Sequence, residues 1–441
     1  MRTILILGAG RSSSSLISYL LRQSEIHHWT ITVADMDSRL AEDKAASHPN
    51  ARAIAFDIKN EEERRKLIRD HSLVISMLPA FMHGDVARDC VEAGVHLATA
   101  SYVSAEIRAL NDEAVSKNIL LLNECGLDPG IDHASAMHIL DRLKEQGAEL
   151  LAFKSYCGGL VAPESNTNPW GYKFSWNPRN VILAGQGTAQ YLEQGELKLL
   201  PYNRLFKQSE VVHIKGLGDF DAYANRDSIS YIEAYGLQGI PTMLRGTLRQ
   251  KGYCKAWNVL VRLGLTDDST RLSHCNRYTY TDLLASLLPG SGGEIKSRLK
   301  QFMAGDWDPE IESMLESLDL FAHRKIELKE ATPAQLLQHL LEDKWKLQAL
   351  DKDMVVLQHQ FSYRLPSEKA ARLLRSSLVV IGKDQKQTAM ALTVGLPLAI
   401  TVKNLLCGKL KLSGIQIPTH KAIYEPLLKE LEQEGLVFTE E

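Results

Sequence analysis

The first part of the chain alternates short apolar runs with amphipathic stretches. The runs have the length of buried strands, and the stretches repeat their apolar positions with the period of a helix. Continuous apolar strands that alternate with helices predict a parallel sheet with both faces covered. The expected strands span residues 3–7, 29–34, 52–56, 72–77, 95–99 and 118–123. The expected helices span residues 12–23, 37–47, 60–70, 82–93 and 104–117.

The pattern changes after residue 132. A helix is predicted at 132–147, followed by strands at 150–157, 209–215, 242–249, 256–262, 354–363 and 376–381. Residues 268–350 are predicted to be mainly helical. The tail is predicted to contain helices at 387–407 and 420–434, with the segment 414–417 between them, and a short strand at 436–438.

These patterns predict an α/β chain with more than one domain, since 441 residues exceed what one compact core usually holds. We expect a Rossmann-type, doubly wound parallel sheet built from residues 1–128 and the returning tail, residues 390–441. We expect an α+β substrate-binding and dimerisation domain with a helical subregion, residues 129–389, to be inserted between them.

Composition excludes several functions. The 51 basic and 54 acidic residues nearly cancel, so no nucleic-acid partner is expected. The six cysteines show no CxxC spacing, which argues against a structural zinc site, and no metal is expected. The longest uncharged run, residues 388–402, is too short to span a bilayer, so no membrane partner is expected. With no signal peptide recognised, a cytoplasmic protein is predicted.

The first strand leads into the sequence Gly8-x-Gly10-x-x-Ser13, which is typical of a dinucleotide-binding turn. Gly8 allows the tight turn, and Gly10 allows the backbone to approach a pyrophosphate. The following helix offers its free N–H groups to the phosphates, with additional polar contacts from Arg11 and Ser12. The third glycine of the usual motif is replaced by Ser13, so the motif alone is weak.

Asp35 ends the second predicted strand, where an acidic side chain can accept hydrogen bonds from ribose hydroxyls. A carboxylate there repels a 2′-phosphate, so we predict NAD as the cofactor, with NADP not excluded. Asp37 is an alternative for the same role, and a solvated aspartate at a strand end is the other interpretation.

Asp128-Pro-Gly130 follows the sixth strand and opens a helix. Asp128 is predicted either to face the cofactor crevice or to cap the helix. His133 and His138 lie on different helix faces, so a shared metal is not expected.

Loops rich in aromatic and basic residues follow, and an arginine there suits a small anionic substrate because its guanidinium pairs with a carboxylate through two hydrogen bonds. Surface arginines and core tryptophans are the alternative interpretation. The arginines concerned are Arg226, Arg245 and Arg249.

Several segments together resemble the saccharopine dehydrogenases that form L-glutamate. They are the glycine turn, Ser101-Tyr102, Gly126-Leu-Asp-Pro-Gly-Ile-Asp132, Ser155-Tyr-Cys-Gly-Gly-Leu160, Gly171-Tyr-Lys-Phe-Ser-Trp176, Asn225-Arg-Asp227, Arg245-Gly-Thr-Leu-Arg249, Thr393-Val-Gly-Leu-Pro397 and Ile423-Tyr-Glu-Pro426. The resemblance covers nearly the whole chain and is weakest in the helical part. Arg11 departs from the family, in which a bulky apolar residue often follows the second glycine.

The resemblance implies an NAD(P)-dependent homodimer that acts on a small amino-acid substrate. It implies that the cofactor is bound by Gly8, Gly10, Arg11, Ser12, Asp35, Asp57, Leu78, Thr99, Ser101, Gly126, Leu127, Ile131, Asp132 and Trp176. It implies that saccharopine is bound by Ser101, Tyr102, Asp128, Arg226, Thr247, Leu248 and Arg249. The implied catalytic residues are Asp128, Tyr102 and Cys157, although packing is the stronger interpretation of Cys157.

Two alternative functions are compatible with the sequence. A carboxynorspermidine-type dehydrogenase shares the expected fold, but it needs acidic residues for a polyamine, whereas the candidate pocket here is rich in arginine. A non-catalytic NAD-binding regulatory protein is the second alternative.

Overall fold

The chain folds into two compact units in a computed structural model that describes residues 2–184 and 186–441. The first unit runs to Glu149 and also takes in Leu365–Ser367 and Leu378–Thr439. The second unit contains Leu150–Arg364, Glu368–Ser377 and Glu440–Glu441. The helix that follows Asp128-Pro129 thus lies in the first unit, whereas the expected boundary at residue 128 placed it in the inserted domain.

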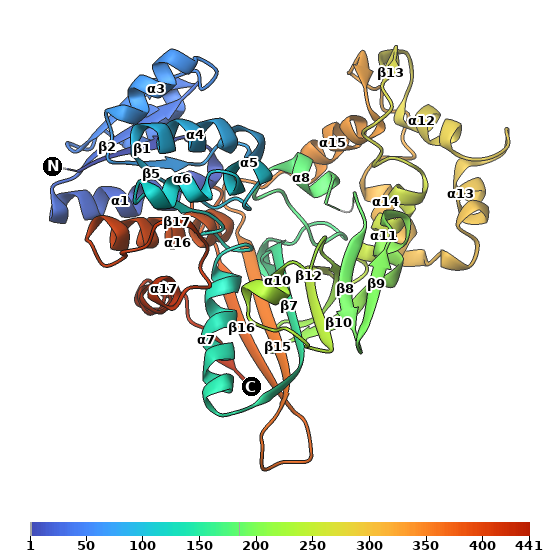
Figure 1. Cartoon of the computed structure of the whole chain (residues 1–441). Coiled ribbons are helices and arrows are strands. Elements are labelled where there is room, and N and C mark those ends of the chain that lie inside the picture. Colours follow the sequence, from blue (N-terminus) through green and yellow to red (C-terminus); the bar gives the residue numbers. More distant parts are fainter. Residues whose placement is uncertain (1, 185) are drawn as a thin grey trace. The chain divides into compact units, whose positions relative to one another are not determined.

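The first unit is built on a parallel sheet of seven strands in the order β17-β6-β5-β4-β1-β2-β3 (Figure 1). Its strands are β1 Thr3–Leu7, β2 Thr30–Asp35, β3 Ala51–Ala55, β4 Leu73–Ser76, β5 His96–Thr99, β6 Leu120–Leu122 and β17 Gly414–Gln416. The predicted Rossmann-type fold is confirmed. Its switch point, where ligands bind in such sheets, lies between β1 and β4.

Helices cover both faces of this sheet. Alternate residues of β1 point to opposite faces, so Leu5 and Leu7 share a core with α3 to α6, while Ile4 and Ile6 are buried on the other face. The helices are α1 Ser14–His27, α2 Ser38–Ala45, α3 Glu61–Arg69, α4 His83–Ala93, α5 Ala105–Arg108, α6 Asn111–Ser116, α7 Ile131–Glu145, α16 Ala389–Leu406 and α17 Lys421–Gln433. Short 3-10 helices, η1 Arg11–Ser13 and η2 Ala80–Met82, precede α1 and α4.

The tail helix α16 packs directly against α1 (Figure 1). At the crossing, a Cβ on Gly395 would lie 2.9 Å from the backbone nitrogen of Leu16 and 3.1 Å from the carbonyl oxygen of Ser12. The close approach explains the glycine in the tail motif. It also ties the tail to the helix that follows the glycine turn. By length and hydropathy α16 could cross a membrane, but 83% of its apolar window is buried inside the protein, which is typical of a core helix.

The second unit is built on a nine-stranded sheet in the order β10-β11-β12-β7-β15-β16-β18, with β8 paired to β12 and β9. Its strands are β7 Glu149–Val161, β8 Ala189–Glu193, β9 Glu196–Leu200, β10 Glu210–Ile214, β11 Gly218–Ala224, β12 Thr242–Gln250, β15 Asp353–Arg364, β16 Arg372–Ile381 and β18 Thr439–Glu440. The predicted mixed α+β architecture is present, but β8, β9 and β11 were not predicted.

The strand predicted at 256–262 is wrong, because these residues belong to helix α11, Tyr253–Arg262. Almost the whole helix is buried, so its sequence reads as the same continuous apolar run that a buried strand gives. The carboxylate of Asp221 accepts hydrogen bonds from the N–H groups of Gly252 and Cys254, both at 3.0 Å, and so caps the first turn.

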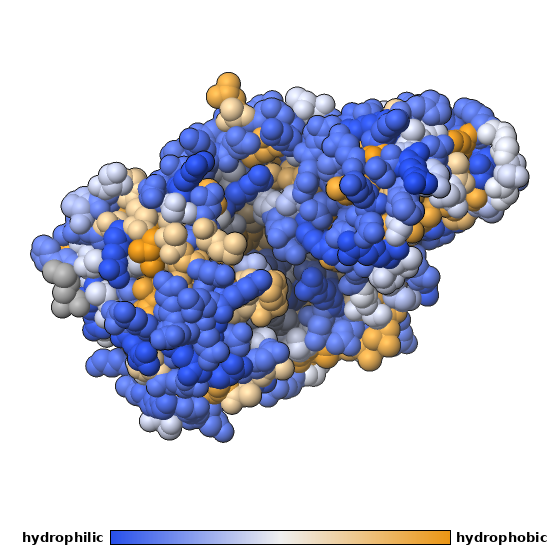
Figure 2. All heavy atoms as spheres, turned by 90° about the horizontal axis from the view of Figure 1, so that it is seen from above, coloured by the Kyte–Doolittle hydropathy of each residue, from blue (hydrophilic) through white to orange (hydrophobic). Residues whose placement is uncertain are grey.

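The part predicted to be mainly helical contains short helices and one two-stranded ribbon. Its elements are β13 Leu272–Ser273, α12 Tyr280–Leu287, α13 Ile295–Met303, α14 Pro309–Ser317, β14 Glu330–Ala331 and α15 Pro333–Lys344. Three shorter helices precede this region: α8 Pro178–Ile182, α9 Tyr202–Leu205 and α10 Tyr231–Ala234. Figure 2 shows that the visible face is mainly hydrophilic, with apolar side chains in small groups.

Replacing Gly395 by Ala is expected to destabilise the protein, although Ala favours a helix over Gly by roughly 1 kcal/mol. The new Cβ forces apart two backbones, a strain of about 1–3 kcal/mol. Urea unfolding measures the loss, and a weaker affinity for NAD is expected with it, because α1 is displaced. The control is Gly84→Ala in α4, whose Cβ would meet only the exposed side chain of Glu106 at 3.3 Å. Equal stability of both variants would contradict the explanation.

Candidate functional site

The glycine turn between β1 and α1 has the form that a dinucleotide requires. Gly8 has φ 100°, and its N–H donates to the carbonyl of Ala34 at 2.8 Å. A Cβ on Gly10 would meet no atom within 4 Å, which leaves open space in front of the turn. The buried Ser13 donates its hydroxyl to the Gly10 carbonyl at 2.8 Å, and in this way it closes the turn in place of a third glycine.

Asp35 links the turn to the end of β2. Its Oδ2 accepts the N–H of Ala9 at 2.7 Å, and its Oδ1 accepts the N–H of Asp37 at 3.0 Å. Each oxygen keeps a second lone pair for a ribose hydroxyl. Asp37 instead caps α2 by accepting the N–H of Arg39 at 3.0 Å, so the structure assigns the two aspartates different local roles.

The end of β3 adjoins a cavity of about 350 Å³. Asp57 is exposed beside it and accepts the N–H of Lys59 at 3.0 Å. The cavity is lined by Ile58, Lys59, Glu61, Arg64, Phe81, Met82, Asp85 and Arg88. The glycine turn, the free lone pairs of Asp35 and this cavity together fit an adenine dinucleotide at the carboxyl ends of β1, β2 and β3.

The carboxyl ends of β4 and β5 lie on the other side of the switch point. Leu78 is half-buried after β4, and Thr99 is buried at the end of β5, where it is the register partner of Ser76. Ser101 is half-buried and Tyr102 is 37% exposed. These predicted residues therefore follow neighbouring strands of one sheet, at the edge where a nicotinamide would lie.

The loop after β6 is a compact turn with a cis peptide bond between Asp128 and Pro129. Leu127 and Ile131 are buried, and Asp132 accepts the N–H of Gly130 at 2.5 Å. Asp128 is half-buried in this turn. The loop therefore holds Asp128 at the carboxyl end of β6, the edge of the sheet where Tyr102 follows β5.

Sequence reasoning missed Glu124, which fixes the backbone on both sides of Tyr102. The N–H of Glu124 donates to the carbonyl of Ser101 at 3.0 Å, and its Oε1 accepts the N–H of Val103 at 3.1 Å. Oε2 lies 2.9 Å from Nε2 of the buried His133. A buried acid with φ 55° has no local sequence signal, since its partners come from another loop and from α7.

In the second unit, strand register brings predicted substrate residues together. Thr247 of β12 is the partner of Cys157 on β7 and of Tyr223 on β11. The three side chains form one row across adjacent strands, and Arg249, two residues along β12, lies on the same face. Leu248 points to the opposite face and is fully buried.

Arg249 is a buried cation, only 3% exposed. Its carbon Cζ lies 5.2, 5.7 and 5.4 Å from the ring centres of Tyr172, Tyr223 and Tyr253. Burial raises the pKa of all three phenols, so they stay protonated and bring no negative charge. Among the described residues Arg249 pairs with no carboxylate, and its Nε has no hydrogen-bond partner.

The remaining predicted residues of this unit lie in two loops. Arg226 is exposed with φ 41°, in a turn where its carbonyl accepts the N–H of Gln190 at 2.7 Å. Trp176 is half-buried and donates its Nε1–H to the hydroxyl of Tyr172 at 3.0 Å. The loop before Trp176 is anchored by the ion pair of Lys173 and Asp351 at 2.6 Å.

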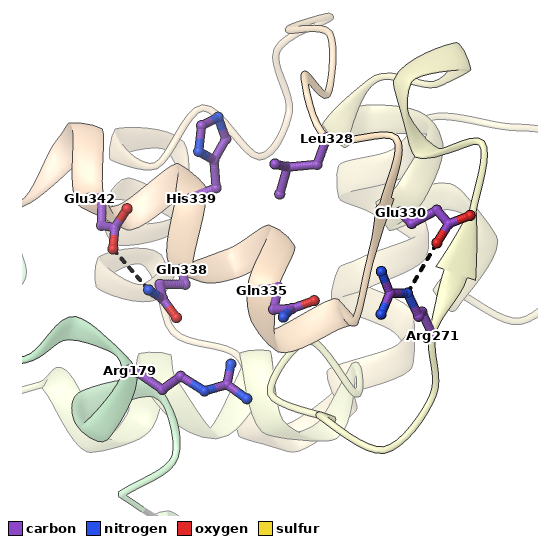
Figure 3. A pocket seen from close by; sticks show the side chains of 8 residues that line it. All are labelled: Arg179, Arg271, Leu328, Glu330, Gln335, Gln338, His339 and Glu342. Atoms are coloured by element: carbon purple, nitrogen blue, oxygen red, sulfur yellow. Dashed lines mark hydrogen bonds and ion pairs between the residues drawn. The ribbon is translucent and has the colours of Figure 1, made fainter. Parts of the chain in front are cut away.

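A separate cavity of about 510 Å³ lies in the helical part of the second unit (Figure 3). Some of its polar side chains bond one another, as in the pairs Arg271–Glu330 at 3.2 Å and Gln338–Glu342 at 2.8 Å. It is lined by Arg179, Arg271, Leu328, Glu330, Gln335, Gln338, His339 and Glu342, and no predicted site residue is among them.

Two family profiles match the chain along almost its whole length. Residues 4–122 match the saccharopine dehydrogenase NADP binding domain, and residues 126–436 match the saccharopine dehydrogenase C-terminal domain. A solved structure of apo histidine-tagged saccharopine dehydrogenase (L-Glu forming) from Saccharomyces cerevisiae superposes with a TM-score of 0.91 at 30% identity, covering 100% of this chain and 99% of that one. Homospermidine synthase from Legionella pneumophila, with a TM-score of 0.56 at 10% identity, shares the fold alone.

Curated relatives agree with these matches. Saccharopine dehydrogenase [NADP(+), L-glutamate-forming] from Schizosaccharomyces pombe is 31% identical over 100% of this chain and 99% of its own length. The mitochondrial alpha-aminoadipic semialdehyde synthase of Mus musculus is 35% identical over 99% of this chain but 47% of its own length, so the chain spans about half of that relative. Along almost its whole length, the chain belongs to the saccharopine dehydrogenase family.

Proposed function

We propose that the protein is an NAD-dependent saccharopine dehydrogenase that forms L-glutamate and 2-aminoadipate 6-semialdehyde in lysine metabolism. The observation that carries the proposal is the buried guanidinium of Arg249, which pairs with no carboxylate among the described residues. A buried charge is costly without a counter-ion, and a substrate carboxylate supplies one. Saccharopine has three carboxylates, whereas a polyamine would add a second positive charge to this pocket.

Each unit contains its own set of predicted residues. In the second unit, Arg249 binds a carboxylate in a dry tyrosine cage, and Thr247 and Cys157 border it on the same sheet face. Arg226 presents an exposed guanidinium for a second carboxylate. In the first unit, Tyr102 and Asp128 orient the bridging amine and handle its proton.

Oxidation of saccharopine requires its bridging amine to be neutral, because a protonated nitrogen has no lone pair to drive the reaction. Asp128 takes the amine proton directly or through water, and Tyr102 helps to orient the amine. NAD, when bound, would accept a hydride from the lysine-derived carbon beside the nitrogen. Hydrolysis of the resulting imine by one water gives glutamate and the semialdehyde.

We further propose a homodimer in the cytoplasm. The family resemblance supports the dimer. The six cysteines are all free, which supports a reducing compartment. The mitochondrial location is that of the mouse relative and is not carried over to this protein.

Production of NADH from saccharopine at alkaline pH tests the function. We expect turnover with glutamate as the second product and a higher kcat/KM with NAD than with NADP. Turnover of a carboxylated polyamine in place of saccharopine would support the carboxynorspermidine-type alternative. Binding of NAD without turnover of either substrate would support the regulatory alternative.

Asp35→Asn tests the cofactor preference. Loss of the carboxylate charge is expected to reduce discrimination against NADP by about tenfold, since a charge near the 2′-phosphate contributes on the order of 1 kcal/mol or more. The ratio of kcat/KM values for NAD and NADP measures the effect. Asp37→Asn is the control, because it keeps the cap of α2. An unchanged ratio in Asp35→Asn would exclude Asp35 from cofactor selection.

Arg249→Met tests the carboxylate site. Removal of a buried, unpaired charge is expected to leave Tm unchanged or higher, while KM for saccharopine rises about 100-fold. KM for NAD is expected to stay unchanged. If Arg249 served packing alone, Tm would fall and KM for saccharopine would stay close to that of the original protein. Arg262→Met, at an exposed ion pair with Asp306, is the matched control.

A further inference from the structure

A buried histidine joins the ends of β4 and β5 in the first unit. Nδ1 of His83 lies 2.9 Å from the hydroxyl of Ser76, and Nε2 lies 2.8 Å from the hydroxyl of Ser101. The hydroxyl of Thr99 lies 3.4 Å from Nε2 and accepts the N–H of Ser101 at 3.2 Å. The imidazole therefore connects three hydroxyls at the carboxyl ends of two paired strands.

His83 is not among the predicted site residues. His83 is the first residue of α4 and is 2% exposed, so its side chain faces the sheet and not solvent. Burial lowers the pKa of His83 to about 4, which keeps the ring neutral at physiological pH. A neutral imidazole has one donor and one acceptor, so each ring nitrogen can satisfy one hydroxyl.

We propose that His83 is a positioning residue that fixes the orientation of the Ser101 hydroxyl for ligand binding. The inference rests on the proposed function and on the family resemblance, which implies that Ser101 contacts saccharopine and the cofactor. A free hydroxyl rotates and offers a donor or an acceptor in many directions. Once Ser101 is bonded to Nε2, rotation of its hydroxyl is restricted, and its remaining hydrogen-bonding capacity is confined to the other two positions around the oxygen. Ser76 holds the opposite side of the ring and thereby fixes its plane.

The two ring nitrogens can be removed separately. The amide of Asn takes the place of Nδ1, so His83→Asn keeps the bond to Ser76 and loses the bond to Ser101. The longer Gln side chain places its amide near Nε2, so His83→Gln keeps the bond to Ser101. A structural role for the ring predicts that both variants, being polar and smaller, lose stability alike.

We expect His83→Asn to lower kcat/KM for saccharopine by about 5- to 20-fold, the effect of one lost hydrogen bond. His83→Gln is expected to stay within about threefold of the original protein, because the bond to Ser101 is restored. Ser101→Ala is expected to lose at least as much as His83→Asn, because it also removes the hydroxyl that contacts the ligand, and the double variant is expected to lose nothing beyond Ser101→Ala. The exposed His213, paired with Asp219, gives the control variant His213→Asn.

Equal losses in His83→Asn and His83→Gln, or additive losses in the double variant, would overturn the proposal. A protein that binds NAD but does not oxidise saccharopine would refute the proposed function instead. In that case, or if a His83 variant does not fold, ring-nitrogen NMR of the unliganded protein decides. Ser101→Ala is expected to shift the Nε2 resonance of His83 and Ser76→Ala its Nδ1 resonance. No shift in Ser101→Ala would refute the positioning role.

Discussion

Parallel strands direct all their carboxyl ends to one edge of a sheet, and the first unit depends on this constraint. Seven parallel strands place the glycine turn, Asp35, Asp57, Ser101 and the turn around Asp128 at that edge. The tail completes the arrangement: β17 pairs with β6, and Gly395 allows α16 to press on α1. A contact between residues almost 400 positions apart in the chain thus holds the helix whose N-terminus we propose to face the phosphates.

The second unit contributes an electrostatic constraint. Arg249 is held among neutral phenols, where a cation is poorly solvated and the interaction with an anion is strong. We propose that a ligand bound beside this guanidinium is selected first by its charge, because a cationic ligand would add to the uncompensated charge. Homospermidine synthase has the same fold with 10% identity, so the fold alone does not choose between amines and carboxylates. We propose that side chains such as Arg249 make this choice.

Much of the first unit was predictable, because its strands and helices differ in period and each glycine or aspartate follows a recognisable strand. The sequence did not distinguish the buried α11 from a strand, since both are continuous apolar runs. It also missed β8, β9 and β11, which are short segments of mixed composition. The sequence allowed the motif residues of the candidate site to be predicted, but not the residues that support them. His83 and Glu124 bond residues in other loops, and such contacts leave no characteristic spacing in the sequence.

These supports show why the loop after β5 can carry a reacting group. A loop that contacts substrate must expose its side chains, yet an exposed loop is free to move. Here Tyr102 is exposed, and Glu124 bonds the backbone on both sides of it. The N–H of Glu124 donates to the carbonyl of Ser101, and its carboxylate accepts the N–H of Val103. The side chain of Ser101 is bonded in turn to His83. Both anchors are buried and therefore shielded from competing water. The loop is thus open to ligand on one side and fixed from the protein interior on the other.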